Sequence, residues 1–541
     1  MFIISPLKNP LRVKKIRILL VMGFFLFCFT VISLRLIDLG VNSERKHTKI
    51  KNNSSAIKTN SSGIKVSRKD ITDRYGVIIA TNIASYSFFA NPQKILDAKK
   101  AAMAVIKIFP DLKKQEVLEK LSQKNTSFVW LKRRITPNKI KDIDKIGEPG
   151  LSYKQEDIRI YPHGNLFSHL LGFTNIDGNG IAGLEKAYDD FLKNQDEENL
   201  RLTLDTRIQE VLHQELQEGL IKYKASGAAG IILDIENNDV IASVSLPDFN
   251  PNEFAKAREN SLFNIITSSV YEMGSTIKAL TFANAYEEKK IKNTELIDVS
   301  KPIRVGRFLI NDHKPRTEPI TPEEAFEISS NIATIKIANR IDIDTKYEFL
   351  KKFGLFDAVI TELPERAKPI PPRPWDENKA VSSSFGYGFA VTPIHIITAI
   401  TAIINDGIYQ VPNFVLSPKS QNATTRLISS QTSTQMRKLM RKVIEVGTGK
   451  EADIKGITII GKTGTAEKIV DGKYNRKKMI SSFYSAFPME RPKYAIFVLL
   501  DEPQGIKETF LLATASMNAV PITKKIIQKI YPILGFSPDK E

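Results

Sequence analysis

The stretch Y-E-M-G-S-T-I-K-A-L-T-F-A-N-A-Y, from Tyr271 to Tyr286, predicts a turn at Gly274 that opens into an apolar helix. Ser275 falls at the start of this helix, and Lys278 follows three residues later. Residues three apart share one helix face, so the lysine amine can reach the serine hydroxyl and take its proton. The apolar residues that follow would desolvate Lys278 and favour its neutral form. The helix N-terminus adds free N–H groups suited to an oxyanion. The stretch therefore indicates an activated serine nucleophile.

The same spacing also arises without any chemistry. Ser-x-x-Lys occurs five more times in this lysine-rich chain, beginning at Ser5, Ser43, Ser55, Ser62 and Ser537. None of these opens a long apolar helical run, which sets the Ser275 motif apart. The alternative for Ser275 and Lys278 is a buried helix with a serine in its capping region and a lysine whose stem lies along apolar surface. Taken alone, the motif leaves both interpretations open.

Composition narrows the class of protein. The chain has 541 residues, of which 42% are hydrophobic and 26% charged, as in a globular protein of several domains. A formal net charge of +18 suits a membrane or an anionic polymer as partner, whereas no recognition helix or aromatic-basic platform indicates nucleic acid. Cys28 is the single cysteine, which excludes an intramolecular disulfide. The six histidines show no metal-ligand spacing, so we expect no metal and no cofactor.

The N-terminus predicts a membrane anchor. Residues 1–17 are short and basic, and an uncharged run follows from Ile18 to Leu34. The Arg35 side chain can reach the membrane–water interface. The span can therefore continue through Leu39 and approach the roughly 20 residues that a bilayer requires. No small-x-small cleavage site follows, which favours an uncleaved signal anchor. We therefore expect a cytoplasmic tail over 1–17, a transmembrane helix over 18–39 and a polar stem over 40–65.

Beyond the stem the pattern indicates two α+β domains. Residues 66–200 combine short strands, turns and a helical section near 94–124 without a nucleophile–base pair, which predicts a pedestal that carries no chemistry. From residue 201 a strand leads into an amphipathic helix and a β-hairpin that turns at Asn237-Asn238. A long, mostly helical region, three strands and a last helix near 520–531 follow. Without alternating βαβ units, this order predicts an antiparallel sheet with helices on both faces and an all-helical lobe.

Two further polar motifs follow the Ser275 helix. Ser329 and Asn331, in I-S-S-N-I, can point into one cleft, where the amide could bind a substrate amide and the hydroxyl could relay a proton. Lys462-Thr463-Gly464-Thr465 opens the first C-terminal strand, and Lys-Thr-Gly occurs only once. Its lysine and threonines can hold a carboxylate, the Thr465 N–H can be a second oxyanion donor, and Gly464 allows another backbone to approach. Alone, these motifs could equally be an Asx turn and an ordinary polar strand end.

Together, the order Ser-x-x-Lys, Ser-x-Asn, Lys-Thr-Gly resembles the active site of penicillin-binding proteins and β-lactamases. The resemblance extends from Arg68 almost to the C-terminus, through R-K-D-I-T-D-R-Y-G, R-I-Y-P-H-G, S-L-P-D-F-N-P-N, S-F-G-Y-G-F-A-V-T-P and D-E-P-Q-G, which look like class B penicillin-binding proteins. G-F-T-N-I-D-G-N-G, Y-E-M-G-S-T-I-K and I-S-S-N are most similar to the division-specific (septal) D,D-transpeptidases of that class. Two features depart from the family pattern. Met273 stands where the family often has proline, and L-L-A-T-A-S-M-N-A-V-P matches only loosely.

The resemblance implies a single-pass protein of the bacterial inner membrane, with a pedestal over 66–200 and a transpeptidase domain over 201–541 in the periplasm. Its substrates would be peptidoglycan stem peptides ending in D-Ala-D-Ala, and β-lactams would acylate the same serine. It also implies a polymerising glycosyltransferase and other division-complex membrane proteins as partners. The family pattern assigns catalysis to Ser275, Lys278 and Ser329 and substrate binding to Asn331, Lys462, Thr463, Gly464 and Thr465, with Lys462 also assisting proton transfer.

Several alternatives stay open at this point. An elongation-specific class B transpeptidase would carry the same three motifs, and a D,D-carboxypeptidase would differ only in using water as acceptor. A β-lactamase would need a deacylating carboxylate, and no Glu-x-x-Leu-Asn lies between Asn331 and Lys462. The intact motifs argue against an idle scaffold, and the pedestal argues against a bare β-lactam sensor. A bifunctional enzyme is disfavoured because the pedestal shows no paired catalytic carboxylates.

Overall fold

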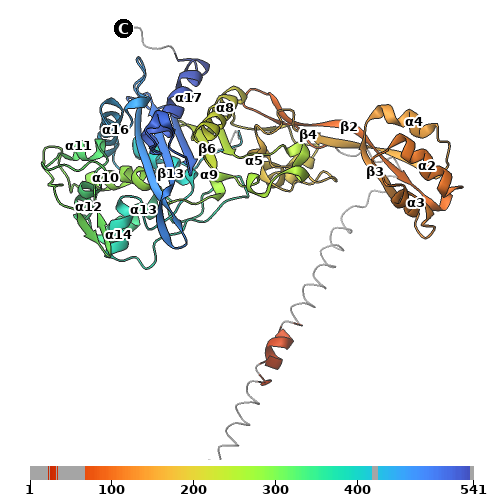
Figure 1. The fold of residues 1–541 in the computed structure, drawn as a ribbon, viewed down its shortest axis with the longest axis horizontal. Coiled ribbons are helices and arrows are strands. Elements are labelled where there is room, and N and C mark those ends of the chain that lie inside the picture. The colour runs from red at the N-terminus through yellow and green to blue at the C-terminus, as the bar shows by residue number, and fades with distance from the viewer. Residues whose placement is uncertain (1–21, 24, 32, 34–66, 417–423, 537–541) are drawn as a thin grey trace, which may run out of the picture. The chain divides into compact units, whose positions relative to one another are not determined.

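The computed structural model describes residues 22, 23, 25–31, 33, 67–416 and 424–536 (Figure 1). The chain divides into two units, residues 1–65 and residues 66–541. The pedestal and the transpeptidase region both belong to the second unit. The expected boundary between residues 200 and 201 therefore stays a prediction.

A five-stranded antiparallel sheet forms the centre of the transpeptidase region, as predicted. The strands follow the order β12-β13-β14-β6-β7, which leaves β12 at one edge. Their bounds are β6 Gly227–Asp234, β7 Asp239–Leu246, β12 Ile460–Val470, β13 Lys473–Phe487 and β14 Tyr494–Asp501. β6 and β7 form the expected hairpin, and Asn238 in its turn has a φ of 56°, a conformation that asparagine tolerates.

Alternate residues of the sheet enter two separate cores, because successive side chains of a strand point to opposite faces. On β6, Ala229, Ile231 and Leu233 belong to the larger core, whereas Ala228 and Ile232 belong to the other. The smaller core includes the apolar faces of α8 Thr206–Lys222 and α17 Ala519–Ile533 (Figure 1). The larger core includes α9 Ile265–Ser268 and α15 Pro393–Ile404. Helices thus cover both faces of the sheet.

The lobe between β7 and β12 is mostly but not wholly helical. Its helices include α10 Lys278–Glu287, α11 Pro322–Glu327, α12 Asn331–Ala338, α13 Ile343–Lys352, α14 Glu377–Ser384 and α16 Ser430–Glu445. The prediction of an all-helical lobe is wrong, because β8 Ile303–Val305 and β9 Phe308–Ile310 form a hairpin there, and β10 Ile408–Tyr409 pairs with β11 Thr425–Arg426. Gly306, with a φ of 55°, supplies the turn of the first hairpin, and Val305 packs with Phe385 in a small core.

The predicted membrane anchor falls mostly outside the described residues. Of residues 18–39, the structure describes 22, 23, 25–31 and 33. Among the described residues, no helix has both the length and the apolar character needed to cross a bilayer. The expected cytoplasmic tail, 1–17, and stem, 40–65, lie outside the described residues.

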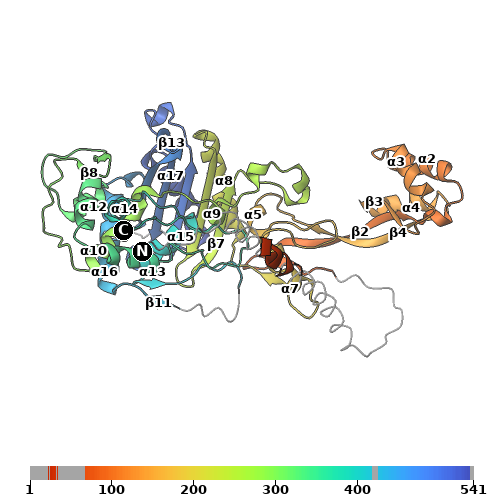
Figure 2. The ribbon, with the colours of Figure 1, turned by 90° about the horizontal axis from the view of Figure 1, so that it is seen from below.

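The pedestal is built on a long antiparallel ladder between β2 Ile78–Ala90 and β4 Leu151–Ile160. This ladder runs from the transpeptidase region to a small helical head (Figure 2). The head contains β3 Val129–Ile135, α2 Ala98–Ile108, α3 Lys114–Ser122 and α4 Ile140–Asp144. The helical section expected near 94–124 is therefore two helices. At the other end, β1 Ile71–Thr72 pairs in parallel with β5 Leu200–Arg201.

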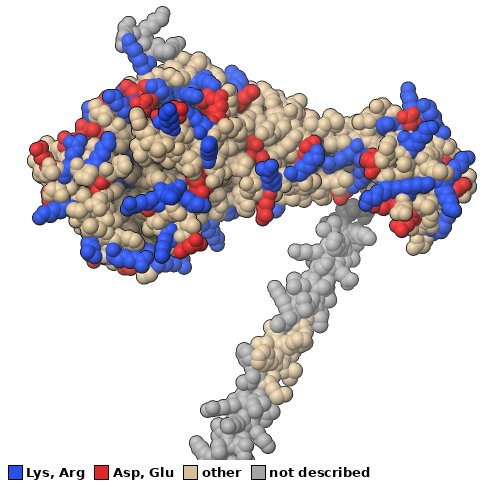
Figure 3. Space-filling model, in the orientation of Figure 1, with Lys and Arg blue, Asp and Glu red and all other residues tan. Residues whose placement is uncertain are grey.

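Charged side chains cover the surface of both regions. Lys and Arg prevail on the visible face of the pedestal head and around the transpeptidase region (Figure 3). On this face, lysines and arginines are spread over both regions.

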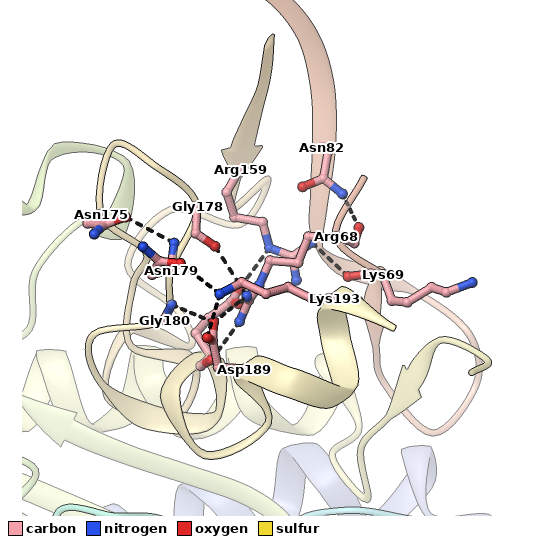
Figure 4. A network of polar contacts seen from close by, with 11 residues as sticks. Arg68, Lys69, Asn82, Arg159, Asn175, Gly178, Asn179, Gly180, Asp189 and Lys193 are labelled. Atoms are coloured by element: carbon pink, nitrogen blue, oxygen red, sulfur yellow. Dashed lines mark hydrogen bonds and ion pairs between the residues drawn. The ribbon is translucent and has the colours of Figure 1, made fainter. Parts of the chain in front are cut away.

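A buried cluster of charges lies where the ladder meets the transpeptidase region. Arg68 Nε donates to Glu185 Oε2 and Arg159 Nε donates to Glu185 Oε1, each at 2.6 Å (Figure 4). Arg68 Nη1 also donates to Asp189 Oδ1 at 2.6 Å. The Glu185 side chain is fully buried in α6 Gly183–Ala187, and Asp189 begins α7 Asp189–Lys193. Two guanidinium groups therefore share one buried carboxylate.

Candidate active site

The Ser275 motif begins at a close contact between three backbone segments. A 3₁₀ turn, Gly274–Ile277, leads directly into α10, so Ser275 precedes the α-helix by three residues. Gly274 has a φ of 52°, and a Cβ atom there would lie 2.6 Å from the carbonyl oxygen of Thr465. Only glycine fits this position, because a side chain would be strained and would clash. The turn thus brings Ser275 against strand β12.

The Ser329 motif occupies the turn between α11 and α12. Ser329 has a φ of 61°, an uncommon conformation for a residue with a side chain. Such strain persists where the surrounding structure holds it, often at functional sites. The next residue, Ser330, caps α12, because its hydroxyl accepts a hydrogen bond from the Ala333 N–H at 3.0 Å. Asn331 is the first residue of the helix.

The Lys462 motif lies on the edge strand β12. Lys462 and Gly464 share one face of this strand, because they are two residues apart. A Cβ atom on Gly464 would lie 2.6 Å from Ser482 Oγ and 2.9 Å from the carbonyl oxygen of Met273. Glycine therefore lets β12 approach the turn that carries Ser275. The free edge of β12 leaves backbone groups available to an extended peptide.

Both motif lysines converge on Ser329. Lys278 Nζ lies 2.6 Å from the Ser329 carbonyl oxygen, 2.7 Å from Asn331 Oδ1 and 3.3 Å from Ser329 Oγ. Lys462 Nζ donates to Ser329 Oγ at 2.9 Å and to the Thr463 carbonyl oxygen at 3.1 Å. Among the described residues Ser275 Oγ has no hydrogen-bond partner. The amine of Lys278 is bonded to the Ser329 turn and not to the Ser275 hydroxyl. The three motifs are thus brought together in space.

The two amines are held in conditions that favour loss of a proton. Both lysine side chains are fully buried. Burial lowers the pKa of Lys278 to about 7, and the negative charge of Asp312 opposes this effect. Burial also lowers the pKa of Lys462 well below its usual range, and the nearby amine of Lys278 lowers it further. A neutral Lys278 has two N–H groups, which match its two carbonyl acceptors, and its lone pair stays free to accept a proton.

The two threonines of β12 are each fixed by a neighbouring segment. Thr463 Oγ1 and Thr448 Oγ1 lie 2.7 Å apart. Thr465 Oγ1 accepts a hydrogen bond from the Ala515 N–H at 3.2 Å, so its own hydrogen is free to be donated. Ser516 Oγ donates to the Thr448 carbonyl oxygen at 2.7 Å. The loop before α17 therefore contacts both threonines, Thr465 directly and Thr463 through Thr448.

Sequence reasoning missed Asp312, which holds the Ser329 turn from behind. Its carboxylate is buried and accepts hydrogen bonds from Ser330 Oγ at 2.6 Å, from the Asn331 N–H and from the Ile332 N–H at 3.0 Å. The negative charge of this carboxylate lies at the N-terminus of α12, where it also complements the helix dipole. Asp312 and its partners are about 20 residues apart in the chain, and no local spacing signals this contact. Thr448 was missed for the same reason.

Two sequence families match the chain. Residues 228–528 match the penicillin-binding protein transpeptidase domain, and residues 63–217 match the penicillin-binding protein dimerisation domain. The chain belongs to the penicillin-binding protein family. This assignment confirms the resemblance drawn from the three motifs.

Similar proteins cover most of the chain. The probable peptidoglycan D,D-transpeptidase FtsI of Caulobacter vibrioides is 31% identical over 96% of this chain and 89% of its own length. Peptidoglycan D,D-transpeptidase FtsI of Escherichia coli is 27% identical over 82% of this chain and 80% of its own length. A crystal structure of a Mycobacterium penicillin-binding protein 3 complexed with aztreonam has a TM-score of 0.69 at 22% identity, covering 88% of this chain and 98% of that one. That structure shows a shared fold.

Proposed function

We propose that this penicillin-binding protein is a serine-type peptidoglycan D,D-transpeptidase that cross-links stem peptides ending in D-Ala-D-Ala. One observation carries the proposal: two buried lysine amines meet at Ser329, beside the Ser275 turn and the free edge of β12. The similarity to the FtsI transpeptidases of Caulobacter vibrioides and Escherichia coli supports the substrate class. β-Lactams would acylate the same serine.

The acylation step uses Ser275 as nucleophile and Lys278 as base. Ser275 Oγ attacks the carbonyl carbon of the penultimate D-alanine, and its proton moves to the neutral amine of Lys278. The backbone N–H groups of Ser275 and Thr465 stabilise the oxyanion. The C–N bond to the last D-alanine then breaks, and the leaving amine receives a proton through Ser329, which Lys278 and Lys462 both contact.

Substrate binding falls to the remaining motif residues. The donor peptide extends along the edge of β12, and its terminal carboxylate is held by Lys462 and the hydroxyls of Thr463 and Thr465. Asn331 orients the peptide backbone. An amine of a second stem peptide then attacks the ester carbonyl, a new C–N bond forms, and the C–O bond to Ser275 breaks. The attacking amine gives up a proton to the neutral amine of Lys278, and Lys278 returns it to Ser275 Oγ as the C–O bond breaks.

The sequence and the relatives also support a proposal for the biological setting. We place the catalytic domain in the periplasm, carried by a single-pass anchor over residues 18–39, because residues 18–34 form an uncharged run of suitable length. The similarity to FtsI proteins supports a septal role over an elongation role. A polymerising glycosyltransferase and other division-complex proteins are the proposed partners of the pedestal.

Covalent labelling tests the proposed function directly. Fluorescent penicillin should label the full-length protein, and the labelled peptide should map to Ser275. The Ser275→Ala variant lacks the nucleophile and should gain no ligand mass at any penicillin concentration. A label on another serine, or a labelled Ser275→Ala protein, would show that the organising helix is wrongly assigned.

A further inference from the structure

Two hairpins from different parts of the fold meet beside the active site. Phe308 of β9 packs against Tyr474 of β13, with ring centroids 6.3 Å apart. Tyr474 also packs edge to face on Tyr387, at 5.3 Å. These contacts join the β8–β9 hairpin of the helical lobe to the outer half of the β12–β13 hairpin of the sheet.

Each hairpin is tied to one of the catalytic motifs. Asn311 directly follows β9, and its carbonyl oxygen accepts a hydrogen bond from Asn331 Nδ2 at 3.0 Å. The Tyr474 hydroxyl donates to Glu272 Oε1 at 3.2 Å, and Glu272 lies three residues before Ser275. The joined hairpins therefore border the approach to the Ser275 turn and to Asn331.

Basic side chains are frequent on these two hairpins and in the loop that follows β9. Six of them are exposed, and none lies within salt-bridge distance of an acidic side chain in the described part of the chain. We call this set the basic arch, and its members are Arg304, Arg307, Lys314, Arg316, Lys473 and Lys477. Over 303–318 and 471–478, the exposed acidic residues are Glu318 and Asp471. Blue side chains surround a hollow in Figure 3, in the region where Figure 1 labels β13, α12 and α14.

Unpaired charges of one sign beside a cleft have a physical consequence. They repel one another in the free protein, and they raise the local concentration of ligands of opposite charge. Arginine guanidinium groups also bind carboxylates through two parallel hydrogen bonds, which orients the ligand. The arch thus suits a carboxylate-bearing molecule that enters the cleft from outside.

We propose that the basic arch binds carboxylates of the acceptor stem peptide and so directs its amine toward the acyl-enzyme. This inference rests on the proposed transpeptidation. The donor carboxylate belongs to Lys462, Thr463 and Thr465 on the edge strand, so the arch is left for the peptide that enters second. The reaction itself is unchanged: the acceptor N attacks the ester carbonyl, and Ser275 Oγ leaves with a proton.

Acceptor peptides that differ only in charge test this inference. The full-length protein would receive a D-Ala-D-Ala donor peptide and an amine acceptor with either free carboxylates or carboxamides. We expect the wild-type protein to prefer the carboxylate acceptor by roughly tenfold in kcat/KM, as a few exposed charge pairs together would give. Salt of about 1 M should shrink this preference, because it screens exposed charges.

Two matched variants separate the arch from total charge. Arg304→Gln, Arg307→Gln, Lys473→Gln and Lys477→Gln combined should abolish most of the preference. The control removes four exposed lysines outside the hairpins, through Lys224→Gln, Lys289→Gln, Lys292→Gln and Lys438→Gln, and should keep the preference. If the arch variant keeps the preference, or if both variants lose it, the inference is wrong.

Two further readouts keep the outcomes distinct. If neither acceptor is preferred, while vesicles containing anionic phospholipid bind the wild-type protein and not the arch variant, the arch is a membrane contact and the inference fails. Penicillin acylation of Ser275 is measured on the same samples and involves no acceptor. Loss of acylation in the wild-type protein would overturn the proposed function, whereas intact acylation without acceptor preference would overturn this inference alone.

Discussion

Two clusters of buried basic side chains in the described structure are stabilised in opposite ways. In the pedestal, Arg68 and Arg159 share the buried carboxylate of Glu185. In the active site, Lys278 and Lys462 are fully buried together, and no carboxylate lies within salt-bridge distance of either amine in the described structure. A buried charge is costly unless it is paired or becomes neutral. The pedestal pairs its charges, whereas the active site lowers the pKa of its amines.

The pedestal uses arginine and the active site uses lysine, and each side chain suits its environment. Arginine stays protonated at any physiological pH and binds a carboxylate through a fixed fork, so it can hold parts of a fold together. Lysine loses its proton readily when buried, so it can become a base. Removing a buried charged group from the pedestal should therefore mainly lower stability. Removing a buried amine from the active site should mainly lower activity.

The largest expected effect is on acylation. Lys278→Met removes the base and should slow penicillin acylation of Ser275 by about 10²–10⁴-fold. The fold should keep its stability or gain about 1 kcal/mol, since an apolar side chain costs less to bury than an amine. Stopped-flow acylation and thermal unfolding measure the two quantities.

A buried lysine outside the three motifs provides the control for Lys278. Lys346 on α13 is also buried, and burial lowers its pKa, yet its amine contacts only the Ala338 carbonyl oxygen among the described residues. Lys346→Met should leave acylation within about threefold of the wild type, because this amine is not bonded to the Ser329 turn. An equal loss of acylation in both variants would mean that Lys278 acts through the fold and not as a base.

The next effect in size is on the pedestal. Glu185→Ala leaves two buried guanidinium groups without their shared carboxylate, which should lower the free energy of unfolding by about 3–5 kcal/mol. Penicillin acylation at a temperature where the variant is folded should stay close to that of the wild type. Lys193→Ala removes a partly exposed partner of Asp189 and should cost about 0.5 kcal/mol or less. Loss of acylation in step with stability would show that the pedestal cluster also shapes the active site.

Sequence patterns predicted more of the candidate active site than of the buried charge cluster in the pedestal. The three motifs predict the site residues because each has a fixed local spacing, and the structure brings Lys278, Lys462 and Ser329 within hydrogen-bond distance. No sequence pattern predicted the pairing of Arg68 with Glu185, because the two residues are 117 positions apart and no local spacing reveals the contact. The contacts of Asp312 and Thr448 with the motif residues were not predicted, for the same reason.

The β8–β9 hairpin shows another limit of local patterns. The segment I-R-V-G-R-F-L-I lies in a region whose other segments are mostly helical, and a strand of three residues is too short to give a clear period. Its stability comes from tertiary contacts, since Val305 packs with Phe385 and Phe308 packs with Tyr474. The sheet strands, in contrast, are long and apolar and were predicted from the sequence.

A smaller effect concerns pH. Only the neutral form of Lys278 accepts a proton, so the acylation rate should rise about tenfold per pH unit below pH 7 and level off above it. The unfolded lysine keeps a pKa near 10.5, so between pH 7 and 10.5 the unfolded chain binds more protons, and the free-energy cost of burying this residue falls as pH rises. Acylation rates between pH 5 and 9 test the first statement. A rate independent of pH in this range would rule out Lys278 as the base.

The smallest effect should come from Asp312, whose charge opposes the lowering of the pKa of Lys278. Asp312→Asn keeps the shape of the side chain but removes this charge, so the acid limb of the acylation profile should move to lower pH. The plateau above pH 7 should fall several-fold, because the Ser330 and Asn331 donors lose a charged acceptor. Ser330→Ala removes one of these hydrogen bonds without changing the charge, so it should lower the plateau and leave the acid limb in place. A limb that moves in both variants would mean that the geometry of the turn, and not the charge of Asp312, sets the pKa of Lys278.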